Sequence, residues 1–172
     1  MRNGNTISLG LGPGLAALSL LAACSRPAAP GGAEGAASGA APTATSAPTD
    51  ADRKAILATL PAAYQGADLD NGQSKIALCK ACHTLNKGGE AAVGPNLWGV
   101  FGRKAGSAPG FAYSDGMKAL GGAWDADRIN TWISKPSAMV PGTKMTYAGM
   151  ESPKDRIDVV AYLKVITTAP AK

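Results

Sequence analysis

The stretch CKACH, residues 79–83, holds two of the three cysteines in the chain and its only histidine. A disulfide between the two cysteines is one interpretation and is possible in an oxidising compartment. A thioredoxin-like redox pair would follow a strand, whereas Ile76, Cys79 and His83 have helical spacing. Zinc is a second interpretation, but it takes four ligands and only three obvious candidates are present. C-x-x-C-H is the signature for covalent haem, in which each cysteine forms a thioether and the histidine binds the iron. The sequence therefore predicts one haem c, attached at Cys79 and Cys82 and ligated by His83.

The second axial position of the iron is either open, filled by water or closed by a protein ligand. A second histidine is absent from the sequence, so a bis-histidine site is excluded. Pro141-Gly142 forces a turn just before Met145, which is able to aim a loop residue inward. Periodicity alone does not choose among the methionines that follow the first 23 residues, which are Met117, Met139, Met145 and Met150.

Residues 1–23 have the pattern of a signal peptide of the lipoprotein type. Arg2 precedes an apolar run of about 15 residues, which is too short and too broken by proline and glycine for a spanning helix. The run ends in LAAC, which resembles a bacterial lipobox with lipid on Cys24. The alternative is an ordinary signal peptide cut near Ala23, which would leave a free thiol.

Residues 24–66 are interpreted as a lipid-anchored flexible linker with a short helix at 50–60. Between residues 25 and 49, 23 of the 25 residues are Ala, Gly, Pro, Ser or Thr, which cannot bury enough apolar area to fold. Asp50 is the expected cap of the short helix, and Pro61 would end it. Its apolar stripe, formed by Ile56, Leu57 and Leu60, predicts packing on the following domain at 67–172.

Composition limits the possible functions. The formal charge is +5 at pH 7, and the basic residues are scattered singly, which argues against nucleic acid as a partner. Aromatic residues are only 5% of the chain, which is few for a self-sufficient core. A cofactor filling the centre of the domain accounts for this shortage.

Several motifs in order, CKACH, GPNLWGVFGRKAGSAPGFAYSDGMK and PGTKM, resemble class I cytochromes c of the mitochondrial and alphaproteobacterial type. The resemblance covers roughly residues 67–172. It implies an all-α fold of three to five helices wrapped around one covalently bound haem c. It also implies that Met145, 62 positions after His83, is the sixth ligand of the iron through its thioether sulfur, a soft donor that raises the reduction potential.

The resemblance assigns further haem-binding residues. Pro95 would accommodate the His83 ring and supply a carbonyl for its second N–H. Propionate contacts would come from Arg103, Tyr113 and Trp124, with Thr143 nearby, because buried carboxylates require hydrogen-bond partners. Three positions depart from the usual pattern: Trp132 replaces a tyrosine that donates to the methionine sulfur, Met117 replaces an asparagine, and Ile76 replaces an aromatic residue.

Helices are expected at 70–82, 115–120, 126–134 and 153–167, with a long loop carrying Pro95 across the haem. Ser152 is the expected cap of the last helix, and Pro153 occupies its first turn. Gly72 would allow Tyr162 to approach closely where the terminal helices cross.

The function expected from this resemblance is one-electron transfer between a quinol–cytochrome c reductase and a terminal oxidase, without enzymatic activity or a small-molecule substrate. The protein would be a monomer on the periplasmic side of a bacterial membrane, either inner or outer, docking through Tyr147 and four lysines near the haem edge. The alternatives are a fixed electron-transfer subunit of a periplasmic dehydrogenase and a haem peroxidase. The four lysines are Lys80, Lys87, Lys104 and Lys144.

Overall fold

A computed structural model describes residues 47–168 of the 172-residue chain. In that part the secondary structure is helical, apart from one isolated bridge between Lys104 and Ala123, so the predicted all-α class is confirmed. The signal peptide, Cys24 and the linker up to residue 46 lie outside the described residues. The helices are α1 Asp50–Ala58, α2 Ala62–Gln65, α3 Leu69–Lys75, α4 Ala77–Lys80, α5 Asp115–Ala119, α6 Ala126–Ser134, α7 Pro136–Met139 and α8 Pro153–Ile166.

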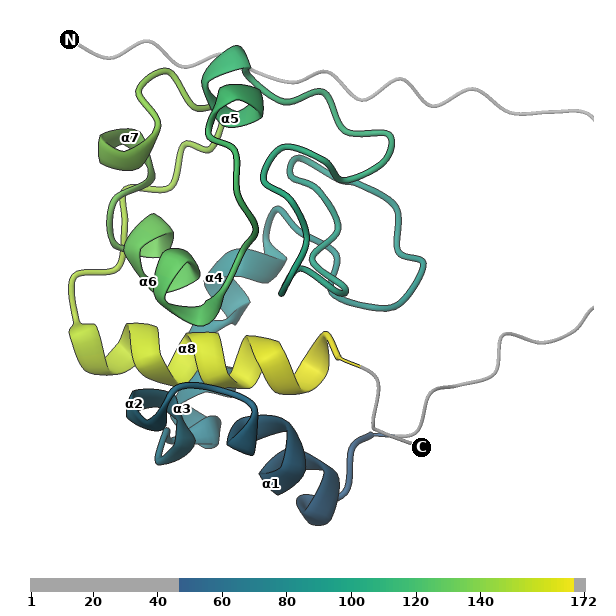
Figure 1. Cartoon of the computed structure of the whole chain (residues 1–172), viewed down its shortest axis with the longest axis vertical. Coiled ribbons are helices and arrows are strands. Elements are labelled where there is room, and N and C mark those ends of the chain that lie inside the picture. The colour runs from purple at the N-terminus through teal and green to yellow at the C-terminus, as the bar shows by residue number, and fades with distance from the viewer. Residues whose placement is uncertain (1–46, 169–172) are drawn as a thin grey trace, which may run out of the picture. The chain divides into compact units, whose positions relative to one another are not determined.

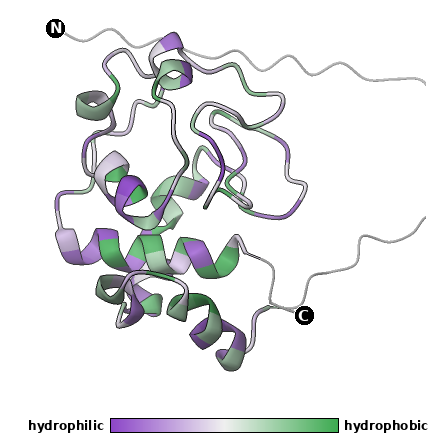
Figure 2. Ribbon diagram, in the orientation of Figure 1, coloured by the Kyte–Doolittle hydropathy of each residue, from purple (hydrophilic) through white to green (hydrophobic). Residues whose placement is uncertain are grey.

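Helix α8 is the central element of this arrangement. Figure 1 shows α1, α2 and α3 on one side of α8, with the other helices and the long loops on the opposite side. Ser152 caps α8 as predicted, since its side chain accepts a hydrogen bond from the Asp155 N–H at 3.2 Å. The middle turns of α8 are apolar (Figure 2), and Val159, Val160 and Ala161 are almost fully buried there.

The α3 and α8 backbones approach closely at Gly72. A Cβ atom at this position would collide with the Asp158 carbonyl oxygen and lie 2.7 Å from Cβ of Tyr162, so the expected close approach is confirmed. Asp158 is only 1% exposed. Its carboxylate accepts hydrogen bonds from the Asp68 N–H, the Asn71 amide and the Lys154 ammonium. The crossing therefore combines tight backbone packing with a fully partnered buried charge.

The expected helix at 70–82 is two helices that meet at Ile76. The backbone of Ile76 stays in the right-handed region, and its N–H still donates to Gly72. The Cys79 N–H donates to Ile76 three residues back, which tightens the turn and separates α3 from α4. The expected helix at 126–134 is confirmed as α6. Helix α7 was not expected, and Pro136 occupies its first position.

Helices α1 and α2 lie in the segment interpreted as linker. The cap of α1 is Thr49 and not Asp50: Thr49 and Asp52 exchange hydrogen bonds in a capping box, and Asp50 is in the first turn. Ile56 and Leu60 are buried, and α1 and α2 pack against α8, as the apolar stripe predicted. The folded part of the chain therefore includes residues before 67. Within residues 47–168, each helix is too short or too polar to span a bilayer.

Candidate functional site

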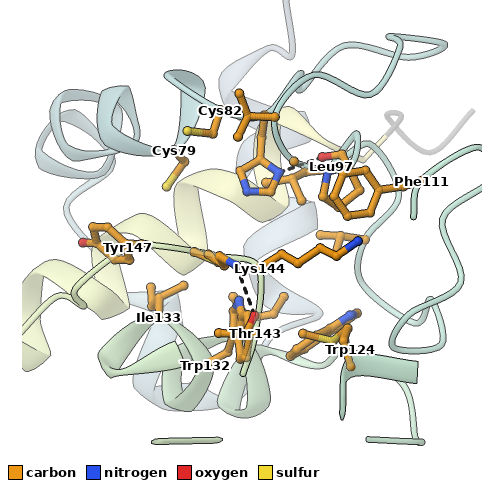
Figure 3. Close-up of a pocket in the computed structure, with 18 of the residues that line it drawn as sticks. Cys79, Cys82, Leu97, Phe111, Trp124, Trp132, Ile133, Thr143, Lys144 and Tyr147 are labelled. Atoms are coloured by element: carbon orange, nitrogen blue, oxygen red, sulfur yellow. Dashed lines mark hydrogen bonds between the residues drawn. The ribbon is translucent and has the colours of Figure 1, made fainter. Parts of the chain in front are cut away.

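A cavity of about 350 Å³ opens between α4, α6, α8 and the loops, and its walls are mostly apolar. Figure 3 shows Cys79 and Cys82 along one wall, with Trp124 and Trp132 on the opposite wall. The structure brings together in this lining every haem-binding and iron-binding residue that the sequence predicted within the domain. These residues are Cys79, Cys82, His83, Pro95, Arg103, Tyr113, Trp124, Trp132, Thr143 and Met145.

The His83 ring is fixed by the loop that crosses in front of it. Its Nδ1 lies 2.7 Å from the Pro95 carbonyl oxygen. A carbonyl oxygen only accepts hydrogen bonds, so Nδ1 carries the proton and Nε2 keeps a free lone pair. Burial lowers the pKa of His83, and this effect outweighs the opposing effect of the Pro95 carbonyl, so the imidazole is neutral at pH 7. A neutral ring with one nitrogen oriented in this way is the form that binds a metal.

Gly94 is a functional residue that the sequence analysis missed. A Cβ atom there would collide with the His83 imidazole. Only glycine allows the loop backbone to pass this close to the ring and still place the Pro95 carbonyl at Nδ1. The glycine-proline pair in GPNLWG was the available signal, because a glycine next to a functional proline marks a close backbone approach.

Cys79 is part of α4, and Cys82 follows the end of this helix by two residues. The Cys82 and His83 N–H groups both donate to the Cys79 carbonyl oxygen, at 3.1 and 2.9 Å. These bonds keep both thiols and the imidazole within one tightened helical turn. Burial, together with the neighbouring Cys82, raises the pKa of Cys79 to about 11. Cys79 is therefore a protonated thiol at neutral pH, a form of low nucleophilicity.

The opposite wall is aromatic and comes largely from α6. The Trp124 and Trp132 rings have centroids 5.8 Å apart at an angle of 55°, and both residues are less than 10% exposed. The Arg128 guanidinium lies 5.3 Å from the centroid of the Trp124 ring. Ile129 and Ile133 complete this wall, so it offers a large apolar surface.

Polar groups enter the cavity at a few points. The Arg103 guanidinium donates to the Asn96 carbonyl at 2.8 Å and to the Trp98 carbonyl at 3.3 Å, which holds it half-buried at the lining. Phe111 packs edge-on against Tyr113 with ring centroids 4.8 Å apart. The cavity thus has mostly apolar walls with a few polar side chains, among them Arg103 and Tyr113. Such a lining suits a ligand that is mostly apolar and carries anionic groups.

The structure narrows the choice of methionine. Met117 on α5 and Met145 in the loop after α7 both line the cavity. Met150 is buried in the core cluster, and Met139 packs against that cluster. The Met145 N–H donates to the Thr143 side chain at 3.2 Å, which fixes the turn that carries Met145 into the lining.

Several apolar lining residues lie in loops and could not be predicted from periodicity. Leu78 and Val93 are the most exposed large hydrophobic residues of the described chain, at 57% and 76%, and both belong to the cavity lining. Leu97, Val100 and Phe111 line its interior. Two thiols, an oriented imidazole, a thioether and an aromatic wall form a set of donors and surfaces that fits a covalently attached haem.

Comparison with known proteins agrees with this fit. The cytochrome c family model matches residues 69–167. The cytochrome c homolog of Rickettsia bellii is 42% identical over 105 residues, which are 61% of each chain. Cytochrome c2 of Rhodomicrobium vannielii is 42% identical over 109 residues, 63% of this chain and 87% of the relative, and cytochrome c of Theileria annulata is 46% identical over 86 residues, 50% and 74% respectively. The chain thus spans about three fifths of the length of the Rickettsia relative. The chain belongs to the cytochrome c family, with the all-α fold of a class I member, a family that binds haem c covalently.

Proposed function

We propose that this protein is a one-electron carrier whose haem c is attached at Cys79 and Cys82 and ligated by His83 and Met145. The observation that carries the proposal is the orientation of His83: Nδ1 is committed to the Pro95 carbonyl, and the cavity it borders also receives Met145 and both cysteines. The bound haem supplies an iron that alternates between the ferric and ferrous states. The names of the relatives, cytochrome c and cytochrome c2, support the same function.

The residues of the chain favour electron transfer over catalysis. Ligation by the His83 imidazole and the Met145 thioether would leave no coordination position on the iron for a substrate. The apolar walls exclude water and favour the less charged reduced state, and the soft thioether acts in the same direction. Arg103, Tyr113, Trp124 and Thr143 are the side chains we expect to hold the propionates.

Replacement of the sixth ligand tests this proposal. Met145→Ala should abolish the long-wavelength sulfur-to-iron absorption band, open the iron to cyanide, and lower the reduction potential by on the order of 0.1 V. Met117→Leu is the matched control, because Met117 also lines the cavity, and it should keep the band. An unchanged potential in Met145→Ala, or loss of the band in Met117→Leu, would reject Met145 as ligand.

We further propose that the donor and acceptor are a quinol–cytochrome c reductase and a terminal oxidase. Lys80, Lys87, Lys104 and Lys144 are exposed, and Lys144 lines the cavity together with the exposed side chain of Leu78. Charges at such a site accelerate association more than they tighten binding. The rate of oxidation by isolated membranes should fall steeply with ionic strength, and a rate independent of salt would contradict docking through these lysines.

Membrane attachment through lipid on Cys24, on the periplasmic side, is a separate proposal that rests on the LAAC motif. Cys24→Ser should release the protein from membranes with its haem spectrum intact. Retention of this variant in the membrane fraction would reject the lipid anchor without affecting the assignment of the haem site.

A further inference from the structure

We propose that α2 positions the loop that carries Met145, through a relay of hydrogen bonds from Tyr64 to Asn130 and on to Arg156. The Met145 loop is defined as residues 141–151, between α7 and α8. The inference rests on the proposed function, because it gives the loop importance as the carrier of an iron ligand. It makes part of the segment interpreted as linker a positioning element of the haem site.

The relay begins at Tyr64 on α2. The side chain of Tyr64 is 2% exposed, and its hydroxyl donates to the Asp127 carboxylate on α6 at 2.8 Å. The same hydroxyl accepts a hydrogen bond from the Asn130 amide at 3.1 Å. Burial and the Asp127 hydrogen bond raise the pKa of Tyr64 to about 12, so the hydroxyl remains a donor throughout the neutral range.

Asn130 on α6 connects Tyr64 with Arg156 on α8. Its amide nitrogen is committed to Tyr64, and its amide oxygen accepts from Nε of Arg156 at 2.8 Å. An amide with a defined partner on each side has one preferred orientation, because a flip would place donor against donor. Tyr64 therefore fixes the orientation in which Asn130 receives the guanidinium.

Arg156 in turn holds the end of the Met145 loop. Its Nη1 donates to the carbonyl oxygens of Met150 at 2.7 Å and Glu151 at 2.6 Å. The Met150 N–H donates to the Ile133 carbonyl on α6 at 2.9 Å, and the Met150 side chain is buried. The last residues of the loop are thus fastened to α6 and α8 at the positions where the relay ends.

The Met145 loop is also held at its start, by contacts that do not involve the relay. The relay therefore acts on the position of Met145 through the end of the loop. The Thr143 N–H donates to Val140, and the Lys144 ammonium donates to the Ala112 carbonyl at 2.8 Å. Gly149 passes so close to α6 that a Cβ atom there would collide with the Ser134 carbonyl. With no helix between the two ends, the separation and direction of those ends determine where Met145 lies.

The test compares two variants of the full-length, haem-loaded protein. Tyr64→Phe removes the hydroxyl and keeps the ring, whereas Ile56→Ala removes buried apolar contacts of α1 and keeps the relay. The probe is cyanide, whose binding to ferric iron requires Met145 to leave. Tyr64→Phe should bind cyanide about fivefold faster, the effect expected for one lost hydrogen bond. Ile56→Ala should lower the melting temperature more, yet change the cyanide rate less than about twofold.

A second variant and a second measurement keep the test decisive. Arg156→Lys retains the charge but has no second nitrogen, so it cannot bind Asn130 through Nε and both carbonyls through Nη1 as the guanidinium does. It should increase the cyanide rate at least as much as Tyr64→Phe. Amide hydrogen exchange at Met145 and Met150 should accelerate in both relay variants. A cyanide rate in Tyr64→Phe equal to that of the wild type, or an equal rise in Ile56→Ala, would overturn the relay. Absence of the sulfur-to-iron band in the wild type would instead reject the proposed ligation and this inference with it.

Discussion

The two sides of α8 differ in how they are held together. On one side, α1, α2 and α3 pack against α8, and the α3–α8 crossing carries a network around Asp158 (Figure 1). On the other side, residues 81–114 contain no assigned helix, and the loops surround a cavity. The helical side is stabilised by contacts within the protein. On the cavity side, the apolar walls do not pack against each other. A large flat ligand between them would supply the missing contacts.

This difference indicates a division of roles. The helical side can order the chain before the haem site is complete, because its contacts need only protein atoms. The cavity side gains most of its packing when the haem is present, since a dry apolar cavity of this size forfeits dispersion contacts along its whole lining. We expect changes on the two sides to have separable effects on folding and on the haem.

The largest expected effect comes from removing the haem. The double variant Cys79→Ser, Cys82→Ser, prepared without haem, should lose amide exchange protection on the cavity side by on the order of 1000-fold. Amides of α3 and α8 should lose far less. Exchange measured by mass spectrometry resolves the two sides, and the same variant should give no haem stain after boiling in detergent. A uniform loss of protection on both sides would contradict the division.

A methyl group at the crossing should have the next largest effect. Gly72→Ala forces a Cβ against the α8 backbone, and we expect the free energy of unfolding to fall by about 3 kcal/mol. Chemical denaturation of the haem-loaded protein measures this. Gly66→Ala is the control, because a Cβ at Gly66 meets no atom within 4 Å, and it should change stability by less than about 0.5 kcal/mol. Similar effects of the two substitutions would show that the crossing is not tightly packed.

The charge network at the crossing should appear as a dependence of stability on pH. Burial raises the pKa of Asp158, but the hydrogen bonds from Lys154, Asn71 and the Asp68 N–H outweigh it, so the pKa lies below its ordinary value. A lowered folded-state pKa gives stability that is complete above about pH 4 and is lost as the pH falls through the lowered value.

Asp158→Asn should therefore destabilise the protein by about 2 kcal/mol at pH 7. The difference from the wild type should shrink below about pH 4, as the wild-type carboxylate becomes protonated. Urea titrations at pH 7 and pH 3 provide the measurement. A difference of the same size at both pH values would mean that packing, and not the charge, dominates at this position.

The smallest expected effect is at the start of α8. Ser152→Ala removes the acceptor for the Asp155 N–H and should cost about 1 kcal/mol of unfolding free energy. Thr49→Ala removes the cap of α1, a helix at the edge of the described fold, and should fray that helix with a smaller change in global stability. Thermal unfolding followed by circular dichroism compares them. A larger loss in Thr49→Ala would place α1, and not α8, at the centre of stability.

The residues that share the cavity were easier to predict from the sequence than the bounds of the helices. CKACH specifies its own chemistry, because the cysteines and histidine must share one turn, and the motifs around Pro95 and Met145 follow in a recognisable order. The caps were predictable where proline and serine adjoin, as at Ser152. The cap of α1 was misplaced by one residue, because Thr49 and Asp50 are both good caps and only the geometry chooses between them.

Long-range contacts account for what the sequence did not predict. The burial of Tyr64 against α6 joins residues 63 positions apart, and no local pattern indicates it. The role of Gly94 depends on the position of an imidazole 11 residues earlier, across a loop without periodicity. Apolar loop residues such as Val93 and Phe111 line the cavity because they would contact the enclosed ligand. Hydrophobic periodicity does not indicate contacts of this kind.

The single histidine has a practical consequence for spectroscopy. In nuclear magnetic resonance, the carbon-bound ring protons of His83 are the only imidazole signals that the chain can give. With the ligation proposed above, their shifts would report on the iron and on the Pro95 contact, with no need to distinguish them from other histidines. His83 is therefore a natural spectroscopic label within the candidate haem site. After selective isotope enrichment of histidine, the maturation of this site can be followed in crude extracts from one pair of resonances.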